Sequence, residues 1–540
     1  MPAAWVGAIG TGLFLLLSFV VVPSLRTHFY SDDLVLLVEN QSLPLTQSFD
    51  QLHRPLRNII LKLAERQFGL DPLPYRLTVF IFYLLFLASL GWLLLRLEVR
   101  QPLAVISGVA LVAFFPRNHS ALFWFAASQD VMVALLLVLS CGLFLCYRES
   151  GANLAVLGSA VAFGLALGFK ETAIMLPALV LVLELYRRRR PSRQRINSFW
   201  PPYLIFAGVL LAYVTYFLID REGATPVEKS TGGYYHLGGP LVAAKAFSRL
   251  FANLLLPFAH SFSLHEMDGY KVTLCILVFF GVAITSYRTG CFRALAAGLV
   301  WILLAAAPVS VFAHAINADH YLLVPVIGAA IVIASIIQKG FSANSKFVAA
   351  ILLVYSGLGA YQLILYRHDS SHAAEEFGNS VQSLLTAEPP INPTSEVYVV
   401  GLVHSSEYYP VANNGFRTGL LIHGFPRSAS LAYNFADPSE AERALLASIA
   451  KCRVLSDTDT ATNPERVLLV NADGTPALDR TGVCAMDLIR RDQGKRPEAW
   501  FFAKGRAVSK SFPRVRERTA RELPGGTDTA LCTIKSRLAS

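Results

Sequence analysis

Long apolar runs recur through the first two thirds of the 540-residue chain, and they restrict its fold more than any other feature. Runs of about 17 to 24 residues can cross a hydrocarbon core of roughly 30 Å as helices. Hydrophobic residues make up 54% of the chain and charged residues only 16%, which is too apolar for a water-soluble surface. The sequence therefore predicts an α-helical polytopic membrane protein.

The apolar runs number about eleven by their length and periodicity. They lie at residues 3–24, 74–97, 103–116, 128–147, 154–168, 171–186, 199–219, 271–287, 294–313, 321–338 and 346–366. The segment Leu241 to His260 fits either an interfacial helix or a re-entrant piece. The first run lacks a basic leader and a small-residue cleavage pattern, so we expect a retained span and not a signal peptide.

Basic residues between the runs predict the orientation of the chain. The stretch YRRRRPSRQR, which begins at Tyr186, is typical of a cytoplasmic loop under the positive-inside rule. Parity then places the N-terminus inside and everything after Tyr366 outside. The loops that also fall inside, each with Lys or Arg, are LEVRQP, YRESGAN, SYRTGCFR and QKGFSANSK. This distribution explains the formal charge of +10 without a nucleic-acid partner.

Three external segments follow from this topology. Residues 26–73 include a helix predicted to lie in the membrane surface, with apolar residues on one face and Arg54, Asn58, Lys62 and Arg66 on another. Residues 220–270 are rich in Gly and Tyr and are expected to form a loop. The tail, residues 371–540, contains the strand-like stretches SEVYVVGLV and ERVLLVNADGTPALD, the second with a turn at Asp473 and Gly474. We expect a small extracytoplasmic α/β domain there, with a basic end.

Two adjacent acids, Asp32 and Asp33, stand where the first apolar run leaves the bilayer. The apolar stretch LVLLVEN follows them, so they are expected close to apolar surface. Desolvation raises the pKa of a carboxyl group and makes it a better base near neutral pH. We expect one of the two to accept a proton; the alternative for a single acid is a solvated helix cap.

Other charged residues interrupt apolar runs at the predicted outer side. Lys170 and Glu171 break a long run, and charges at membrane depth are costly enough to indicate function. The alternative is a tight hairpin whose polar pair reaches the lipid headgroups. Asp130 begins another run on this side and fits either a supporting role or a helix cap.

Candidate phosphate partners lie on the same side. Arg54 and Arg57 present guanidinium groups that match phosphate oxygens, although basic residues on any interfacial helix attract anionic lipid. His320 and Tyr321 stand at the outer end of a later run, where His320 either binds a phosphate when protonated or caps a helix. Together these residues predict one extracytoplasmic cavity with a base, cations and a lipid-facing wall.

The sequence contains few signals for a metal site or a disulfide. No His, Asp, Glu or Cys cluster has the spacing of a metal site, so no metal or other cofactor is predicted, although a divalent ion is left open. Among the seven cysteines, Cys452, Cys484 and Cys532 lie in the polar tail, where one disulfide is an option.

The order of several motifs resembles the GT-C class of polytopic glycosyltransferases, which includes protein O-mannosyltransferases, TMTC-type mannosyltransferases and bacterial lipid A aminoarabinose transferase. The motifs are SDD, HRPL, DPLPYRLTVFIFYLL, FFPRNHSALFWFAASQD, GFKETAIMLPALVLVLEL and NADHYLLVPVIG. The resemblance covers roughly residues 1–370, which are expected to form the transmembrane catalytic domain with its external loop 26–73.

The resemblance implies an inverting transfer of a sugar from a polyprenyl-phosphate donor to a lipid, glycan or protein acceptor. It places the transfer on the outer side of a bacterial membrane or in the ER lumen. We expect the bacterial inner membrane, with the N-terminus cytoplasmic and the C-terminal domain periplasmic or extracellular, as the basic loops predict. The implied site residues are Asp32 or Asp33 as base, Arg54, Arg57, Lys170, His320 and Tyr321 toward the donor phosphate, and Asp130 and Glu171 in support. His320 departs from the pattern, since relatives usually have Arg there.

Two other classes of protein compete with this interpretation. A transporter or flippase of lipid-linked sugars also places charged residues along a membrane path, but such proteins usually contain internal repeats, and we find no convincing repeat in this sequence. A scaffold built around the outer domain leaves the two acids after the first run unexplained.

Overall fold

The structure is a computed structural model, and the part that it describes comprises most of the first 385 residues and five strands beyond them. The described residues are 3–29, 33, 37, 54–69, 71–187, 200–222, 239–258, 269–310, 319–341, 344–385, 396–400, 430–433, 464–469, 498–503 and 506–511. The chain divides into two compact units. One contains Met1–Thr27 and Asn40–His368, and the other contains His28–Glu39 and Asp369–Ser540.

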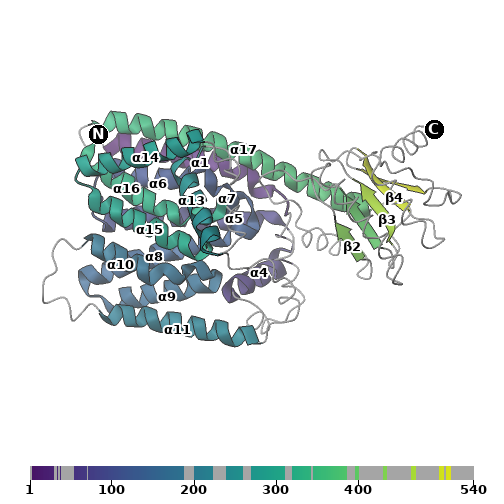
Figure 1. Cartoon of the computed structure of the whole chain (residues 1–540), viewed down its shortest axis with the longest axis horizontal. Coiled ribbons are helices and arrows are strands. Elements are labelled where there is room, and N and C mark those ends of the chain that lie inside the picture. Colours follow the sequence, from purple (N-terminus) through teal and green to yellow (C-terminus); the bar gives the residue numbers. More distant parts are fainter. Residues whose placement is uncertain are drawn as a thin grey trace. The chain divides into compact units, whose positions relative to one another are not determined.

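The first unit is an assembly of helices (Figure 1). Its α-helices are α1 (Ala3–Val21), α4 (Pro55–Phe68), α5 (Pro72–Arg96), α6 (Pro102–Ala113), α7 (His119–Phe123), α8 (Gln129–Ser150), α9 (Asn153–Phe169), α10 (Leu176–Arg187), α11 (Trp200–Glu222), α13 (Pro240–Leu255), α14 (Gly269–Arg288), α15 (Phe292–Ser310), α16 (Pro325–Gly340) and α17 (Ser345–Leu385), the last of which continues into the second unit. Short 3₁₀ turns join several of them: η1 (Val22–Arg26), η2 (Pro116–Asn118), η3 (Phe125–Ala127), η4 (Glu171–Met175) and η8 (Asp319–Leu322).

Each of the predicted apolar runs contains a helix, but the helices differ in length. Within the described residues, six are long and apolar enough to cross a membrane. These are Ala4–Arg26, Pro72–Arg96, Phe125–Ser150, Tyr270–Arg288, Phe292–Ser310 and Ser345–Ser371. Four apolar helices are shorter, at Pro102–Ala113, Asn153–Phe169, Pro201–Tyr216 and Pro325–Gly340. The protein is therefore a multi-pass membrane protein, and the number of spans predicted from the sequence stays a prediction.

Local sequence signals explain where individual helices begin and end. Asp71 accepts a hydrogen bond from the Leu73 amide at 3.0 Å, and Pro72 supplies a preset φ, so α5 begins there. Gly151 ends α8 with φ of 71°, a conformation that costs glycine little. Lys170 adopts an extended backbone that ends α9. The run predicted at 171–186 consequently starts as the 3₁₀ turn η4, and the α-helix starts only at Leu176.

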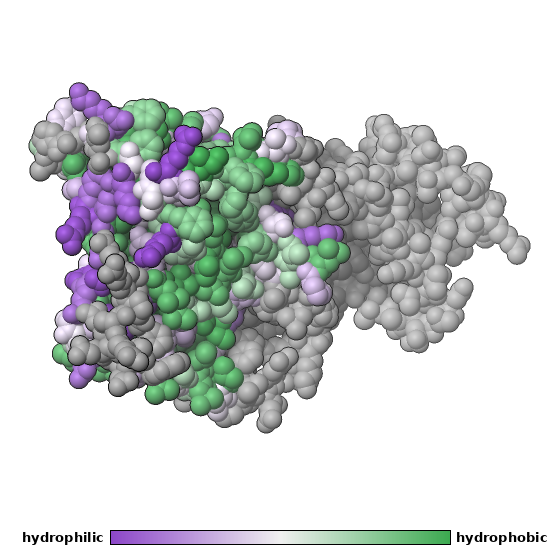
Figure 2. All heavy atoms as spheres, turned by 60° about the vertical axis from the view of Figure 1, so that its left-hand side comes forward, coloured by the Kyte–Doolittle hydropathy of each residue, from purple (hydrophilic) through white to green (hydrophobic). Residues whose placement is uncertain are grey.

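The loops predicted to be cytoplasmic from their basic residues lie together at one end of the helical unit. Arg96 and Arg187 both pair with Glu149, which joins the ends of α5, α8 and α10. At the same end, the Gln338 side chain accepts from the Arg100 amide at 2.5 Å. Hydrophilic residues gather at this end, and apolar surface covers the region beside it (Figure 2). The loops thus share one end, as predicted, and its cytoplasmic orientation stays a prediction.

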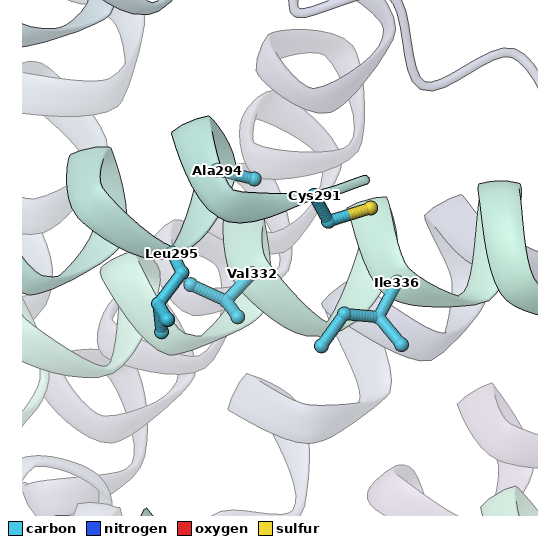
Figure 3. Packing of buried hydrophobic residues seen from close by; sticks show 5 residues of the cluster. All are labelled: Cys291, Ala294, Leu295, Val332 and Ile336. Carbon is cyan, nitrogen blue, oxygen red and sulfur yellow. The ribbon is translucent and has the colours of Figure 1, made fainter. Parts of the chain in front are cut away.

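Helices α15 and α16 pack closely because glycines face each other. A Cβ atom on Gly298 would lie 2.7 Å from the backbone oxygen of Gly328, so only glycine allows this approach. Beside this contact, small and branched side chains interdigitate between the two helices (Figure 3). The cluster consists of Cys291, Ala294, Leu295, Val332 and Ile336. This pair of helices forms a rigid wall of the unit.

Helix α4 turns two of its polar residues, Asn58 and Lys62, inward, whereas Arg66, predicted on the same face, is exposed. Asn58 is fully buried and Lys62 is 2% exposed, whereas Ile60 and Leu63 are exposed. The amphipathic helix predicted in loop 26–73 is thus observed from Pro55, and its outward apolar face suits contact with lipid. A soluble protein would bury the opposite face, since its solvent is water.

The segment that fits either an interfacial or a re-entrant helix forms α13. This helix repeats the inward polarity of α4, because Arg249 and Asn253 are buried one turn apart while Leu241 is exposed. It packs against α14, α15 and the short turn η8. Two amphipathic helices of the unit therefore present polar side chains to the protein interior.

The second unit contains one sheet of five strands, in the order β2-β1-β3-β4-β5. The strands are β1 (Glu396–Val400), β2 (Ser430–Tyr433), β3 (Pro464–Leu469), β4 (Glu498–Ala503) and β5 (Arg506–Ser511). The first four run parallel to their neighbours, and β5 is antiparallel to β4. Strands β1 and β3 fall in the two stretches predicted as strands. The turn at Asp473 and Gly474 and the three tail cysteines lie outside the described residues, and the α/β domain itself stays a prediction.

Candidate functional site: a buried ionic cluster

A bidentate ion pair joins α4 to the end of α9. The Nε and Nη2 atoms of Arg54 donate to the two carboxylate oxygens of Glu171 at 2.9 and 2.6 Å. The remaining Nη1 atom donates to Oε1 of Gln129 at 3.0 Å. Arg54 thereby connects three segments that are far apart in the sequence. Parallel N–H···O bonds of this kind fix direction as well as distance.

A second ion pair lies deeper. The Nζ atom of Lys170 donates to both carboxylate oxygens of Asp130, at 2.7 and 2.8 Å. Lys170 Nζ also lies 4.5 Å from the ring centroid of Tyr321, and His320 Nε2 lies 4.0 Å from Asp130. The ring of Trp124 meets that of His320 edge-on at 5.9 Å. The aromatic rings form an apolar wall beside the pair.

Two adjacent dipeptides make this arrangement. Gln129 and Asp130 open α8, Lys170 follows the last residue of α9, and Glu171 opens the 3₁₀ turn η4, so the four side chains come from adjoining elements. Asp130 and Lys170 form the deeper ion pair. Glu171 binds Arg54 in the outer pair, and the Gln129 amide oxygen accepts from the same arginine. Because α8 and α9 pack along their whole length, the two pairs are held in one register.

The Glu171 carboxyl is ionised over a wide pH range. Burial raises the pKa of Glu171. The Arg54 charge, the hydrogen bonds from Arg54 and the Lys170 charge together lower it by more, so that the pKa falls from 4.5 to about 2. Arg54 and Glu171 therefore form a true ion pair under ordinary conditions.

Two buried donors on α4 have no such compensation. Within the residues that the structure describes, neither Lys62 Nζ nor Asn58 Nδ2 has a hydrogen-bond partner. The two residues lie one turn apart on the inward face. Asn58 Oδ1 accepts from Arg57 Nε at 3.0 Å, and Arg57 Nη1 contacts Gln129 Oε1 at 3.4 Å. A chain of polar contacts thus runs from α8 to this face. Buried donors without acceptors are costly, and a bound ligand with acceptor oxygens would reduce that cost.

Seven of the predicted site residues come together in this cluster: Arg54, Arg57, Asp130, Lys170, Glu171, His320 and Tyr321. Asp130 does not cap α8, because the helix starts after Ser128 and the Asp130 carboxylate binds Lys170. Lys170 is 1% exposed, so it does not reach outward to headgroups as the hairpin alternative requires.

The two predicted bases are placed differently. Asp33 is fully buried and belongs to the second unit, and Asp32 lies outside the described residues. Arg76 fixes the point where the chain leaves the first unit before these acids, since its Nε donates to the Thr27 carbonyl at 2.7 Å. Its Nη1 donates to the Phe123 carbonyl at 2.7 Å, shortly before α8 begins.

The sequence analysis missed Gln129, Lys62 and Arg76 as candidate functional residues. Lys62 was placed on the polar face of its helix, but nothing in a single sequence shows that this face turns inward. The position of Gln129 beside Asp130 is the only sequence signal for it. Within the described residues, no group of three or more His, Cys, Asp or Glu is arranged to hold a metal ion.

The fold and the cluster define a multi-pass α-helical membrane protein with compensated ion pairs and uncompensated donors on the inward face of one helix. No protein-family model and no curated protein matches the chain.

Among solved structures, the chain is similar to ArnT from Cupriavidus metallidurans bound to undecaprenyl phosphate, with 13% identity, a TM-score of 0.45, and coverage of 83% of this chain and 88% of that one. It is also similar to the same protein in the apo state, with 14% identity, a TM-score of 0.36, and coverage of 80% and 86%. A third similar structure is the arabinofuranosyltransferase AftD from Mycobacteria, with 10% identity, a TM-score of 0.39, and coverage of 80% of this chain and 33% of that one.

Proposed function

We propose that this protein is a membrane glycosyltransferase of the GT-C class that transfers a sugar from a polyprenyl-phosphate donor to an acceptor on the extracytoplasmic side. The observation that carries the proposal is the pair of buried, unsatisfied donors Asn58 Nδ2 and Lys62 Nζ on the inward face of α4. An ammonium and an amide one turn apart match the charge and the acceptor oxygens of a phosphate. The opposite, lipid-facing side of α4 suits a ligand that arrives with an isoprenoid chain.

The two ion pairs limit which cations take the phosphate. Arg54 and Lys170 each hold a carboxylate, so their charge is already compensated. We assign them to assembly of the site, and Glu171 and Asp130 with them. Lys62 then carries the charge that meets the phosphate. Arg57 lies on the same helix and contacts Asn58, which lies one turn before Lys62. His320 and Tyr321 line the deeper pair.

The chemistry follows from a phosphate leaving group and a base. The acceptor oxygen attacks the anomeric carbon, the bond from that carbon to the phosphate oxygen breaks, and the acceptor proton passes to Asp32 or Asp33. The leaving polyprenyl phosphate gathers negative charge, which the Lys62 ammonium stabilises. Phosphate is a good leaving group, so the proposal needs no general acid.

A transporter or flippase of lipid-linked sugars is the second candidate. A buried ammonium on the inward face of α4 also suits a protein that moves a lipid phosphate without chemistry. The need for a catalytic base distinguishes the two functions. Sugar transfer requires a proton acceptor, whereas translocation does not.

A deletion strain tests the proposal. Mass spectrometry of its envelope lipids, glycans and proteins should show the loss of one sugar residue, and the wild-type chain should restore it. Asp33→Asn and Asp32→Asn, singly and together, should report which acid is required while membrane insertion stays intact. Asp71→Asn is the matched control, because Asp71 is exposed and asparagine caps a helix as well as aspartate does. Full complementation by both single variants and the double variant would exclude a carboxylate base here.

A further inference from the structure

Gln129 contacts both arginines at the start of α4 through one oxygen. Its Oε1 atom lies 3.0 Å from Arg54 Nη1 and 3.4 Å from Arg57 Nη1. The other end of the amide is anchored, since Nε2 donates to the Ala126 carbonyl at 3.3 Å. The amide is therefore held at the start of α8 with its oxygen turned toward the two guanidiniums.

The neutrality of this contact distinguishes it from the rest of the cluster. The neighbouring contacts to cations come from carboxylates, Glu171 on Arg54 and Asp130 on Lys170. Gln129 orients two guanidiniums but adds no negative charge. A glutamate of nearly the same shape would hold the arginines more strongly, because hydrogen bonds between charged groups are about twice as strong as neutral ones. The cluster has an amide where stability alone favours a carboxylate.

A charge at position 129 would affect the face of α4 that carries the unsatisfied donors. Arg57 binds Gln129 through Nη1 and Asn58 through Nε, and Lys62 lies one turn beyond Asn58. A carboxylate at position 129 would lower the positive potential along this helix face, where low local dielectric strengthens charge interactions. An amide leaves that potential intact.

We infer that Gln129 is a positioning residue that orients Arg54 and Arg57 while keeping the inward face of α4 positive, so that the face binds the phosphate of a lipid. The inference rests on the proposed function, since it assigns the phosphate to that face. It predicts that binding and stability respond in opposite directions when a carboxylate replaces the amide.

The test uses the purified full chain in detergent micelles and measures binding of undecaprenyl phosphate. Gln129→Glu should bind it about tenfold more weakly than the wild type, while the unfolding temperature stays the same or rises. Gln67→Glu is the matched control, because it adds the same charge to an exposed position of α4 and should change the affinity less than about twofold. Undecaprenol and inorganic phosphate, tested in parallel, show whether the lipid chain or the phosphate alone supplies the binding.

The outcomes separate the two proposals. If the wild type does not bind undecaprenyl phosphate, the proposed function is wrong. If the wild type binds it and Gln129→Glu binds it equally well, the role of Gln129 is wrong while the function stands. Loss of both stability and affinity in Gln129→Glu would show a packing role and would also overturn the inference. If Gln129→Glu does not fold, Gln129→Met, which has a similar volume and no acceptor oxygen, should bind about threefold more weakly, and unchanged affinity overturns the inference.

Discussion

The Lys170 ammonium and the Asp130 carboxylate form a buried pair at 2.7 Å that joins α9 to α8, with side chains 2% and 6% exposed. Such a pair is costly to break from one side, because the remaining charge stays buried without its partner. Replacing both partners by apolar residues removes the two charges together. The pair therefore fixes the register of two helices more than it contributes net stability.

This asymmetry predicts the behaviour of a double-mutant cycle. Lys170→Met and Asp130→Leu should each destabilise the protein by about 3 to 5 kcal/mol, and the double variant should recover most of that loss. Thermal unfolding of the purified protein measures the effect. The half-exposed pair of Arg96 and Glu149 is the control, where a single substitution should cost about 1 kcal/mol or less. Additive effects at 170 and 130 would contradict a coupled pair.

Lys62 should behave as a residue kept for binding and not for stability. Lys62→Met removes a buried ammonium that has no partner among the described residues, so the unfolding temperature should rise or stay unchanged. The same variant should lose sugar transfer, whereas Lys62→Arg should retain part of it. Complementation of a deletion strain and thermal unfolding provide the two measurements. A destabilised Lys62→Met protein with normal transfer would assign the lysine to packing.

The pKa of Glu171 sets a pH dependence for the outer ion pair. Since the folded pKa is about 2 and lies below the ordinary value of 4.5, ionised Glu171 stabilises the fold fully above about pH 4.5. This contribution declines as the pH falls from 4.5 toward 2. The difference in unfolding temperature between wild type and Glu171→Gln should be largest near neutral pH and should narrow below pH 4.5. A difference that is constant over this range would argue against the ion pair.

The contact between α15 and α16 predicts which glycines tolerate a methyl group. Gly298→Ala should destabilise the protein by about 1 to 3 kcal/mol, because the new Cβ meets the Gly328 backbone and the helices must separate. Gly281→Ala on α14 has nothing within 4 Å of the new Cβ and should be neutral or slightly stabilising. Thermal unfolding of the two variants side by side is the measurement. Equal effects would show that the close approach is absent.

Cysteine labelling tests the predicted orientation. Ser150→Cys lies at the end that carries the basic loops, and Gln67→Cys lies on the last turn of α4, whose first turn meets the ionic cluster; both positions are exposed. A membrane-impermeant maleimide should label Gln67→Cys in intact cells and Ser150→Cys only after permeabilisation. The unmodified chain sets the background from its own cysteines. The reverse pattern would invert the topology.

The apolar runs and the basic loops between them were sufficient to predict helical segments and a common end for the loops. Hydrophobic length and Arg/Lys bias are properties of consecutive residues, and the membrane acts on them directly. Lys170 and Glu171 interrupt an apolar run and were therefore candidates for the site; the structure brings both into the ionic cluster, and their role in a reaction stays a prediction. The resemblance to GT-C glycosyltransferases stays a prediction of function, tested by the experiments above.

What the sequence could not determine is which charges meet. Nothing in a run of residues shows that Lys170 pairs with Asp130, 40 positions away, or that Arg54 spans 117 positions to Glu171. Nor does periodicity tell whether the polar face of α4 turns to water or to the protein interior. Those outcomes depend on how helices from distant parts of the chain pack, because packing decides which charges lose their water and which partners lie within hydrogen-bond distance. Only the tertiary structure therefore shows that Arg54 and Lys170 are paired with carboxylates, whereas Lys62 has no hydrogen-bond partner among the described residues.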